Sequence, residues 1–177
     1  MIFRESKLKG AFVIELERLE DPRGFFARAW CAEEFAAHGL TPVVQQSNLS
    51  FNFKKGTVRG MHFQIAPYNE AKTVRCTRGR IYDVIIDLRR DSATYKQWFG
   101  VELTADNYKM LYVPENFAHG YLTLEDDTEV AYQVSQFYTP GSERGIRWND
   151  PAFNIEWPRT DDLIISEKDG SWPDYSL

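Results

Sequence analysis

The sequence predicts an all-β protein built mainly from antiparallel strands, with few helices. Short apolar runs recur at regular spacing, and turn signals separate them. Within several runs apolar and polar residues alternate, as they do in a strand with one buried face. The aromatic share of 15% is high, and large flat side chains suit the core of a sheet. These patterns are typical of an antiparallel sandwich or barrel.

The predicted elements follow one another closely along the chain. Strands are expected at 11–19 and 25–30, on either side of the turn Asp21-Pro22-Arg23-Gly24. The segment 31–38 is the predicted helix, because it is rich in Ala, Glu and Phe and Gly39 can cap its end. Beyond residue 139 the strand pattern fades, which predicts an irregular C-terminal segment. The remaining predicted strands are 57–65, 72–77, 80–88, 97–103, 109–113, 119–124 and 128–135.

Alternation assigns side chains to opposite faces of these strands. In 59–64, His62 and Gln64 are expected on one face and Arg59 on the other. In 81–88, Asp83 and Asp87 share one face with two isoleucines, and the other face carries Tyr82, Val84, Ile86 and Leu88. In 128–135, one face carries Val130, Tyr132 and Val134.

Length, charge and cysteine content narrow the classes of protein. A chain of 177 residues fits a single domain, expected to span 1–177. The net charge of −5 argues against duplex nucleic acid as a partner, because phosphate contacts need clustered Lys and Arg. Cys31 and Cys76 make no disulfide framework. No apolar run approaches a membrane span, so we expect a cytoplasmic protein without a membrane partner.

Three histidines are the main candidates for chemistry. His38 lies at the expected helix end, where we expect a structural role. His62 shares a strand face with Gln64, and His119 is expected at the start of a strand. A histidine metal site in a β-barrel usually has two histidines one residue apart on a strand. The residue at that spacing from His62 is Gln64, a poor ligand, so we expect no tightly bound metal.

From the residues alone, each candidate also has an ordinary interpretation. His62 can be a buried core histidine, and His119 a turn histidine. Lys72 can lie at a sheet edge, Tyr132 can be a core aromatic, and Asp169 can be a solvated charge near the end of the chain.

A series of motifs, taken in order, resembles the dTDP-4-dehydrorhamnose 3,5-epimerase (RmlC) family. The resemblance extends from about the first strand to the last few residues. Each motif is weak alone, whereas the ordered series is specific for the superfamily. The motifs lie at 21–26, 46–50, 59–64, 72–75, 83–89, 114–120, 132–138, 145–151 and 166–169.

The resemblance implies a cupin-like jelly-roll barrel with a few short helices, a homodimer, and no metal or cofactor. It also implies an isomerase that inverts C3, C5 or both in a nucleoside diphosphate 4-keto-6-deoxyhexose. The default reaction converts dTDP-4-dehydro-6-deoxyglucose to dTDP-4-dehydrorhamnose, for dTDP-rhamnose and cell-surface polysaccharide biosynthesis.

Family roles can be carried over to matching positions in this sequence. His62 matches the catalytic base, Asp169 its orienting partner and Tyr132 the proton donor. Lys72 matches a residue placed at the sugar, where a fixed cation would stabilise an enolate. The matching substrate-binding positions are Arg23, Phe26, Arg28, Gln46, Asn48, Arg59, His119, Glu143, Lys168 and Tyr138, the last stacking on the nucleobase.

Two departures from the family pattern leave the nucleotide open. Arg28 stands where the family usually has glutamate, and the loop from Asn48 to Arg59 is one residue longer. A carboxylate accepts from the N3–H of thymine, whereas an arginine can only donate, to cytosine or to phosphate. We therefore expect dTDP as the default and keep CDP or another nucleotide as alternatives.

Other functions use a similar barrel. A sugar 3,4-ketoisomerase is the first alternative, although the motifs at 59–64 and 166–169 favour the epimerase. A binding module without catalysis would need no set such as His62, Tyr132 and Asp169. A metal-dependent oxygenase fits the sequence least.

Overall fold

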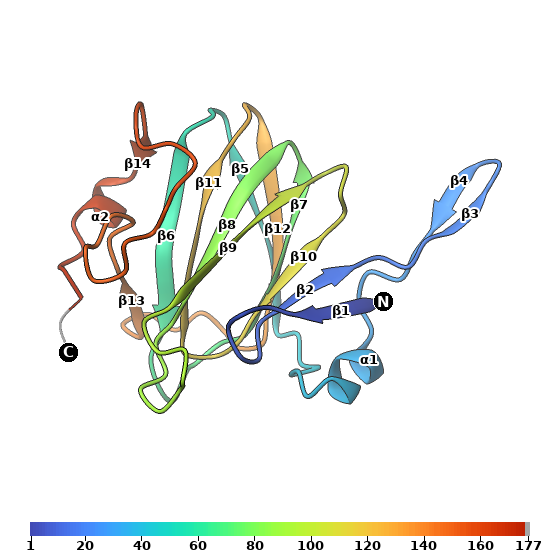
Figure 1. The fold of residues 1–177 in the computed structure, drawn as a ribbon, viewed down its shortest axis with the longest axis horizontal. Coiled ribbons are helices and arrows are strands. Elements are labelled where there is room, and N and C mark those ends of the chain that lie inside the picture. The colour runs from blue at the N-terminus through green and yellow to red at the C-terminus, as the bar shows by residue number, and fades with distance from the viewer. Residues whose placement is uncertain (176–177) are drawn as a thin grey trace.

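Two β-sheets face each other in the computed structural model, which describes residues 1–175 (Figure 1). The strand order is β1-β2-β10-β7-β12-β5 in the first sheet and β13-β6-β11-β8-β9 in the second. All pairs are antiparallel except that of β14, which adds to β6 in parallel. This cupin-like jelly-roll arrangement confirms the predicted all-β fold. Residues 176 and 177 of the predicted domain lie outside the described residues.

Each sheet is described here by the residue bounds of its strands, in chain order. The first sheet contains β1 (Ile2–Glu5), β2 (Phe12–Glu15), β5 (Gln46–Asn52), β7 (Lys72–Arg78), β10 (Met110–Val113) and β12 (Thr128–Val134). The second contains β6 (Thr57–Gln64), β8 (Arg80–Asp87), β9 (Trp98–Thr104), β11 (Phe117–Thr123), β13 (Glu143–Gly145) and β14 (Ile164–Ile165). The remaining elements are β3 (Leu19–Asp21), β4 (Gly24–Phe26), α1 (Ala32–Ala37) and α2 (Glu167–Gly170).

The central core fills the space between the sheets. Val74, Leu111 and Val130 of the first sheet pack there in one buried cluster with Ile81 and Ile85 of the second. Burying these branched side chains on both inner faces removes a large apolar area from water, which holds the sheets together.

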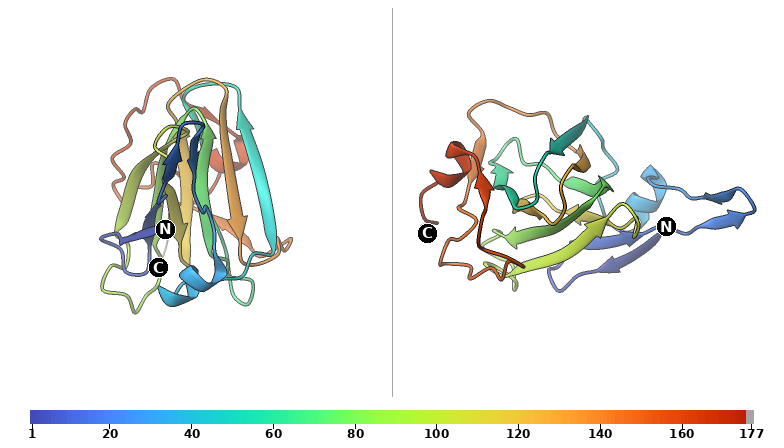
Figure 2. Two further views of the ribbon diagram at one scale, coloured as in Figure 1. Left: turned by 90° about the vertical axis from the view of Figure 1, so that its right-hand side faces the viewer. Right: turned by 90° about the horizontal axis from the view of Figure 1, so that it is seen from above.

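The outer face of each sheet is covered by a different part of the chain. The C-terminal segment lies over the second sheet, where Ile146, Phe153 and Trp157 pack with Val84 and Ile86 (Figure 2). Over the first sheet, Phe35 of α1 packs with residues of β2 and β10, among them Ile14, Met110 and Tyr112.

The predicted helix and the predicted faces of β8 are confirmed. The helix covers Ala32–Ala37, and Gly39 follows it with a left-handed φ of +72°. His38 caps this helix structurally: its Nδ1 contacts the Glu34 carbonyl and its ring stacks on Phe3. The outward cluster over β8 contains Tyr82, Val84, Ile86 and Leu88, as expected.

Four strands were not predicted: β1 and β5, whose patterns differ from a simple buried strand, and the short β13 and β14, which lie in the segment predicted to be irregular. β1 carries charge and little apolar character. β5 has an inverted pattern: Asn48 and Ser50 line the interior cavity, whereas Leu49 is exposed. A strand that lines a polar cavity at the sheet edge has a polar inner face. Its sequence therefore lacks the alternating apolar residues by which the other strands were predicted. The run 11–19 also divides, into β2 and the first strand of a separate hairpin.

The prediction that Arg59 points away from His62 is wrong. In the pairing of β6 with β11, His62 lies opposite His119 and Arg59 lies opposite Tyr121. Three steps on β6 thus match two steps on β11, which is a β-bulge. The extra residue reverses the alternation, so Arg59 and His62 both line the cavity.

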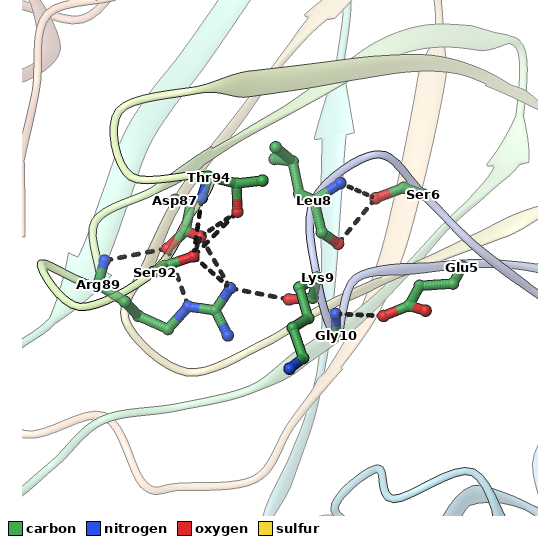
Figure 3. Close-up of polar contacts among 9 residues, drawn as sticks. All are labelled: Glu5, Ser6, Leu8, Lys9, Gly10, Asp87, Arg89, Ser92 and Thr94. Carbon is green, nitrogen blue, oxygen red and sulfur yellow. Dashed lines mark hydrogen bonds and ion pairs between the residues drawn. The ribbon is translucent and has the colours of Figure 1, made fainter.

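The loop after β8 is tied to the barrel by a buried carboxylate, Asp87 (Figure 3). Arg89 donates to Asp87 through Nε and Nη2, at 2.9 and 2.8 Å, and the hydroxyls of Ser92 and Thr94 each donate at 2.6 Å. Arg89 Nη2 also reaches the Lys9 carbonyl, which links this loop to the turn between β1 and β2.

Neither helix in the part of the chain described here has the length and apolar content to cross a membrane.

Candidate active site

A polar cavity opens between the two sheets. Its inner lobe has a volume of ≈ 200 Å³ and its outer lobe ≈ 140 Å³, and His62, Lys72 and Tyr132 line both. The inner lobe is completed by Ser50, Arg59, His119, Tyr121 and Asp169. The outer lobe is completed by Gln46, Asn48, Phe63, Gln64, Glu70, Val134, Tyr138 and Glu143. A polar cavity in an otherwise apolar barrel is a candidate ligand site.

His62 and Asp169 form a hydrogen-bonded dyad on the β6 side of the cavity. His62 Nε2 lies 2.6 Å from Asp169 Oδ1, and the Gly60 N–H donates to Oδ2 at 3.2 Å. The His62 side chain is 30% exposed and that of Asp169 is 6% exposed. Burial alone would raise the pKa of Asp169, but His62 and the Gly60 N–H hold the pKa below its usual value. The carboxylate is therefore ionised at neutral pH and can steady the ring.

Asp169 and His62 are more than a hundred residues apart in the sequence. Contacts of the C-terminal segment bring them together. Ser166 caps α2, since its Oγ accepts from the Asp169 N–H at 3.1 Å. Trp172, just after α2, packs so closely on Gly145 that a Cβ there would overlap its ring. Gly145 is itself the pairing partner of His62 in β13 and β6. The C-terminal segment is thereby fixed against the strand that carries the base.

Tyr132 lies across the cavity from this dyad, on β12 of the first sheet. Its pKa is raised, chiefly because burial disfavours the phenolate and further because Glu70 is negative nearby, while Arg59 opposes the shift. The residue therefore remains a phenol, which can donate a proton, well above neutral pH.

Lys72 begins β7, an interior strand of the first sheet, so it is not the sheet-edge lysine of the ordinary interpretation. Its Nζ lies 3.0 Å from Glu70 Oε1, and both side chains are largely buried. A buried ammonium next to a cavity can stabilise negative charge far better than one in water.

His119, which lines the inner lobe, forms a second dyad with the buried Asp83 behind it. His119 is the third residue of β11 rather than its first, and its Nε2 lies 2.7 Å from Asp83 Oδ1. Asp83 is fully buried, and within residues 1–175 no group hydrogen-bonds its Oδ2. The imidazole is therefore the partner that compensates this buried carboxylate.

Arg59 is held at the edge of the inner lobe by Asn52. Its Nε donates to Asn52 Oδ1 at 2.8 Å, and Asn52 Nδ2 donates to the Thr128 carbonyl at 3.1 Å. The Tyr121 hydroxyl contacts Ser50 Oγ at 2.9 Å in the same network. The guanidinium is thus oriented by buried neighbours, with donors left for a bound anion.

At the mouth of the outer lobe, Tyr138 and Glu143 lie with residues from distant parts of the chain. The Tyr138 N–H donates to Gln46 Oε1 at 2.7 Å, and Lys168 Nζ donates to Glu143 Oε2 at 2.5 Å. The Tyr138 ring is exposed, so one of its faces is accessible to a flat ligand.

Three candidate residues lie away from the cavity of their own chain. Arg23 and Phe26 belong to the hairpin β3–β4, which extends from the body of the molecule (Figure 1). Arg23 pairs with Asp21, and Phe26 is 69% exposed. Arg28 donates to Glu34 at 3.2 Å. None of the three lines either lobe.

Sequence reasoning missed several residues that the cavity brings together, including Asp83, Glu70, Ser50, Asn52 and Tyr121. The face pattern carried a signal for Asp83, since a carboxylate among inward isoleucines needs a buried partner. The other four carried no signal of this kind. Among the described residues, no group of three or more His, Cys, Asp and Glu side chains could hold a metal ion.

A jelly-roll barrel with a histidine–carboxylate dyad facing a phenol across a cavity defines a class of enzyme that can remove and return protons at carbon. The family model for dTDP-4-dehydrorhamnose 3,5-epimerase matches residues 5–176. The chain belongs to this family of epimerases.

Individual relatives support the assignment over nearly the whole chain. A dTDP-4-dehydrorhamnose 3,5-epimerase from Methanothermobacter thermautotrophicus is 42% identical over 96% of this chain and 92% of its own. The crystal structure of the enzyme of that name from Elizabethkingia anophelis has a TM-score of 0.96 at 36% identity, covering 99% and 96% of the two chains. That from Bacillus anthracis, with TDP and PPi bound, has a TM-score of 0.93 at 40% identity, covering 98% and 99%.

Proposed function

We propose that the protein inverts carbons next to the ketone of a nucleoside diphosphate 4-keto-6-deoxyhexose. The observation that carries this proposal is the His62–Asp169 dyad on one wall of the cavity with Tyr132 on the other. Inversion needs a base on one face of the sugar ring and an acid on the opposite face. The default substrate is dTDP-4-dehydro-6-deoxyglucose and the default product dTDP-4-dehydrorhamnose, in agreement with the family.

His62 is the base in this mechanism. Because Nε2 is occupied by Asp169, Nδ1 is the nitrogen that takes the α-proton of the bound sugar. The C–H electron pair moves into the bond to the carbonyl carbon, and the keto oxygen becomes an enolate. Asp169 stabilises the imidazolium that forms, as a buried carboxylate does for a catalytic histidine.

Lys72 supports the enolate and Tyr132 ends the cycle. The proton transfer is uphill by on the order of 15 kcal/mol before stabilisation, because the α-carbon is a far weaker acid than an imidazolium. A preorganised ammonium beside the keto oxygen offsets much of this cost. Tyr132 then donates its proton to the carbon from the first sheet, which gives the inverted centre. Solvent water takes the proton from the His62 imidazolium and returns one to the Tyr132 phenolate, which restores the enzyme.

The two lobes divide the substrate between them. In this proposal the inner lobe holds the hexulose near His119, and Arg59 binds the diphosphate. The outer lobe takes the nucleoside, with Tyr138 stacked on the base and Gln46, Asn48, Glu143 and Lys168 around it. The TDP and PPi in the Bacillus anthracis protein support a nucleotide ligand.

A second copy of the chain would complete the site. Arg23, Phe26 and Arg28 lie away from the cavity of their own chain, although all three match substrate-binding positions. The hairpin that carries Arg23 and Phe26 exposes large apolar side chains, including Leu19 at 65%. In a homodimer, this hairpin can bury those side chains on the partner and bring Arg23 to its diphosphate.

Four finer points remain part of the proposal. The chain acts as a single domain, and its cytoplasmic location stays a prediction. Inversion can occur at C3, C5 or both. Arg28 keeps a cytidine or other nucleotide open as the alternative to thymidine.

The proposed reaction is tested with a panel of 4-keto-6-deoxy sugar nucleotides, including dTDP and CDP forms, incubated with the protein in heavy water. We expect NMR to detect deuterium at each inverted carbon while the carbonyl stays at C4. Movement of the carbonyl would instead identify a 3,4-ketoisomerase. Tight binding without exchange for every substrate would identify a binding module.

The shared site is tested by complementation. Arg23→Ala and His62→Ala are each expected to be nearly inactive as pure proteins. After the two are unfolded together and refolded, mixed dimers would contain one site with both residues intact, restoring about one quarter of the wild-type sites. No recovery despite proven mixed dimers would contradict a contribution of the hairpin to the partner's site.

A further inference from the structure

One largely buried carboxylate in the cavity has no part in the mechanism above. Glu70 lies in the loop between β6 and β7, and its side chain is 12% exposed. It lines the outer lobe together with Lys72 and Tyr132, the two residues that handle the enolate and the returning proton. A carboxylate seldom lies this deep unless its charge is paired.

Both oxygens of Glu70 are held by fixed partners. Oε1 lies 3.0 Å from Lys72 Nζ, and Oε2 accepts from Gln64 Nε2 at 3.3 Å. Gln64 is itself immobilised, because its Oε1 accepts from the Thr139 N–H at 2.8 Å and from Ser142 Oγ at 2.9 Å. The carboxylate is therefore an anchored group rather than a mobile surface charge.

We propose that Glu70 is a positioning residue of the epimerase, which fixes the Lys72 ammonium at the keto oxygen and places a negative charge in the lobe that Tyr132 lines. This inference rests on the function proposed above. It adds a residue that acts through Lys72 and Tyr132 and does not touch the substrate's reacting carbons.

The first part of the role concerns Lys72. A lysine side chain loses rotamer entropy, at a cost in free energy, when it is fixed at one point. The ion pair with Glu70 fixes it before substrate arrives, so that this cost does not fall on the transition state. An ammonium has three N–H donors, so the ion pair with Glu70 still leaves donors for the keto oxygen.

The second part concerns Tyr132. The negative charge of Glu70 adds to burial in raising the phenol's pKa, and Arg59 acts against it. The other charged or titratable groups on the cavity wall are His62, Lys72, His119, Tyr121, Tyr138, Glu143 and Asp169. All of them remain when Glu70 alone is neutralised, so a change in the alkaline limb of activity reports on Glu70.

The test is the pH profile of kcat for Glu70→Gln, a substitution that keeps the shape of the side chain and removes its charge. We expect kcat to fall about tenfold to a hundredfold with a smaller change in KM. We also expect the alkaline limb to move to lower pH, because the phenol loses its negative neighbour. Glu70→Asp, which restores the charge, should return the limb toward the wild-type position.

A matched control and a second variant separate the outcomes. Glu129→Gln changes a part-buried carboxylate that accepts from Thr77 Oγ1 at 2.7 Å outside the cavity, and its profile should match the wild type. An unchanged limb in Glu70→Gln would overturn the proposal, even if kcat falls. If Glu70→Gln does not fold, an unshifted limb and normal kcat in Glu70→Ala, which also removes the charge, would overturn it equally. Absence of epimerase activity in the wild type would instead contradict the proposed function.

Discussion

At the residue scale, catalysis depends on which nitrogen of His62 is free. The contact of Nε2 with Asp169 at 2.6 Å directs the other nitrogen, Nδ1, to the substrate. A carboxylate can only accept, so it holds the neutral ring with its proton on Nε2 and its lone pair on Nδ1. The identity of residue 169 therefore decides whether residue 62 can act as a base.

Asp169→Asn tests this dependence. The amide of asparagine can donate to Nε2, which would leave the proton on Nδ1 and block it as a base. We expect kcat to fall by about 10²–10⁴-fold, with a small change in KM. Steady-state kinetics measures the effect, and wild-type turnover in this variant would contradict the role of Asp169.

At the element scale, the short helix α2 and the strand β13 hold the dyad together. Ser166 caps the helix, and Trp172 after it occupies the space that a side chain at position 145 would need. Since Gly145 pairs directly with His62, a shift of this contact changes the distance between base and carboxylate. Catalytic geometry is sensitive to displacements of about 1 Å.

Gly145→Ala is expected to push Trp172 and α2 away and to lower kcat by about tenfold to a hundredfold. Gly170→Ala is the matched control, because this glycine is next to Asp169 and a Cβ there meets no atom within 4 Å. Kinetics and melting temperature of both variants measure the outcome. Equal activity of the two would show that the Trp172 contact does not position the dyad.

The loop after β8 gives the fold a defined dependence on acid. Burial disfavours the Asp87 carboxylate, but hydrogen bonds from Arg89, Ser92 and Thr94 prevail and lower its pKa to about 2. Because this pKa is lower in the folded state than the unfolded value of about 4, the Asp87 carboxylate stabilises the fold fully at pH values above about 4. That stabilisation is lost as the pH falls toward 2. The contribution is about 2 kcal/mol.

Asp87→Asn should lower the free energy of unfolding at neutral pH by about 3 kcal/mol, because buried donors lose their charged acceptor. It should also flatten the pH dependence of stability between about 4 and 2. Asp126→Asn is the control, since Asp126 accepts from a backbone N–H and a lysine at the exposed surface. Denaturant unfolding at several pH values measures both. An unchanged acid dependence in Asp87→Asn would contradict this account of the loop.

At the scale of the whole molecule, the jelly roll brings together residues that are far apart in the chain. The alternating pattern predicted strands that have one largely apolar face, such as β8 and β12. It did not predict β5, because the inner face of that strand is polar where it lines the cavity. Strand patterns therefore reveal the core of the barrel more readily than the wall of its site.

The site was predicted mainly from the motifs rather than from the alternation. Alternation placed Arg59 on the wrong face, because a bulge against β11 adds one residue to β6. No local pattern relates Asp169 to His62, and their contact exists only because the C-terminal segment wraps back over the second sheet. Glu70 was not predicted for a similar reason, because its role depends on its ion pair with Lys72, which only the structure shows.

The central claim is that removal and return of the proton use different groups on opposite walls. The most direct measurement follows solvent deuterium into the substrate by NMR for His62→Ala and Tyr132→Phe. We predict that His62→Ala abolishes exchange, and that Tyr132→Phe still exchanges the α-proton but does not invert the carbon. Inversion at the wild-type rate in either variant would contradict the account.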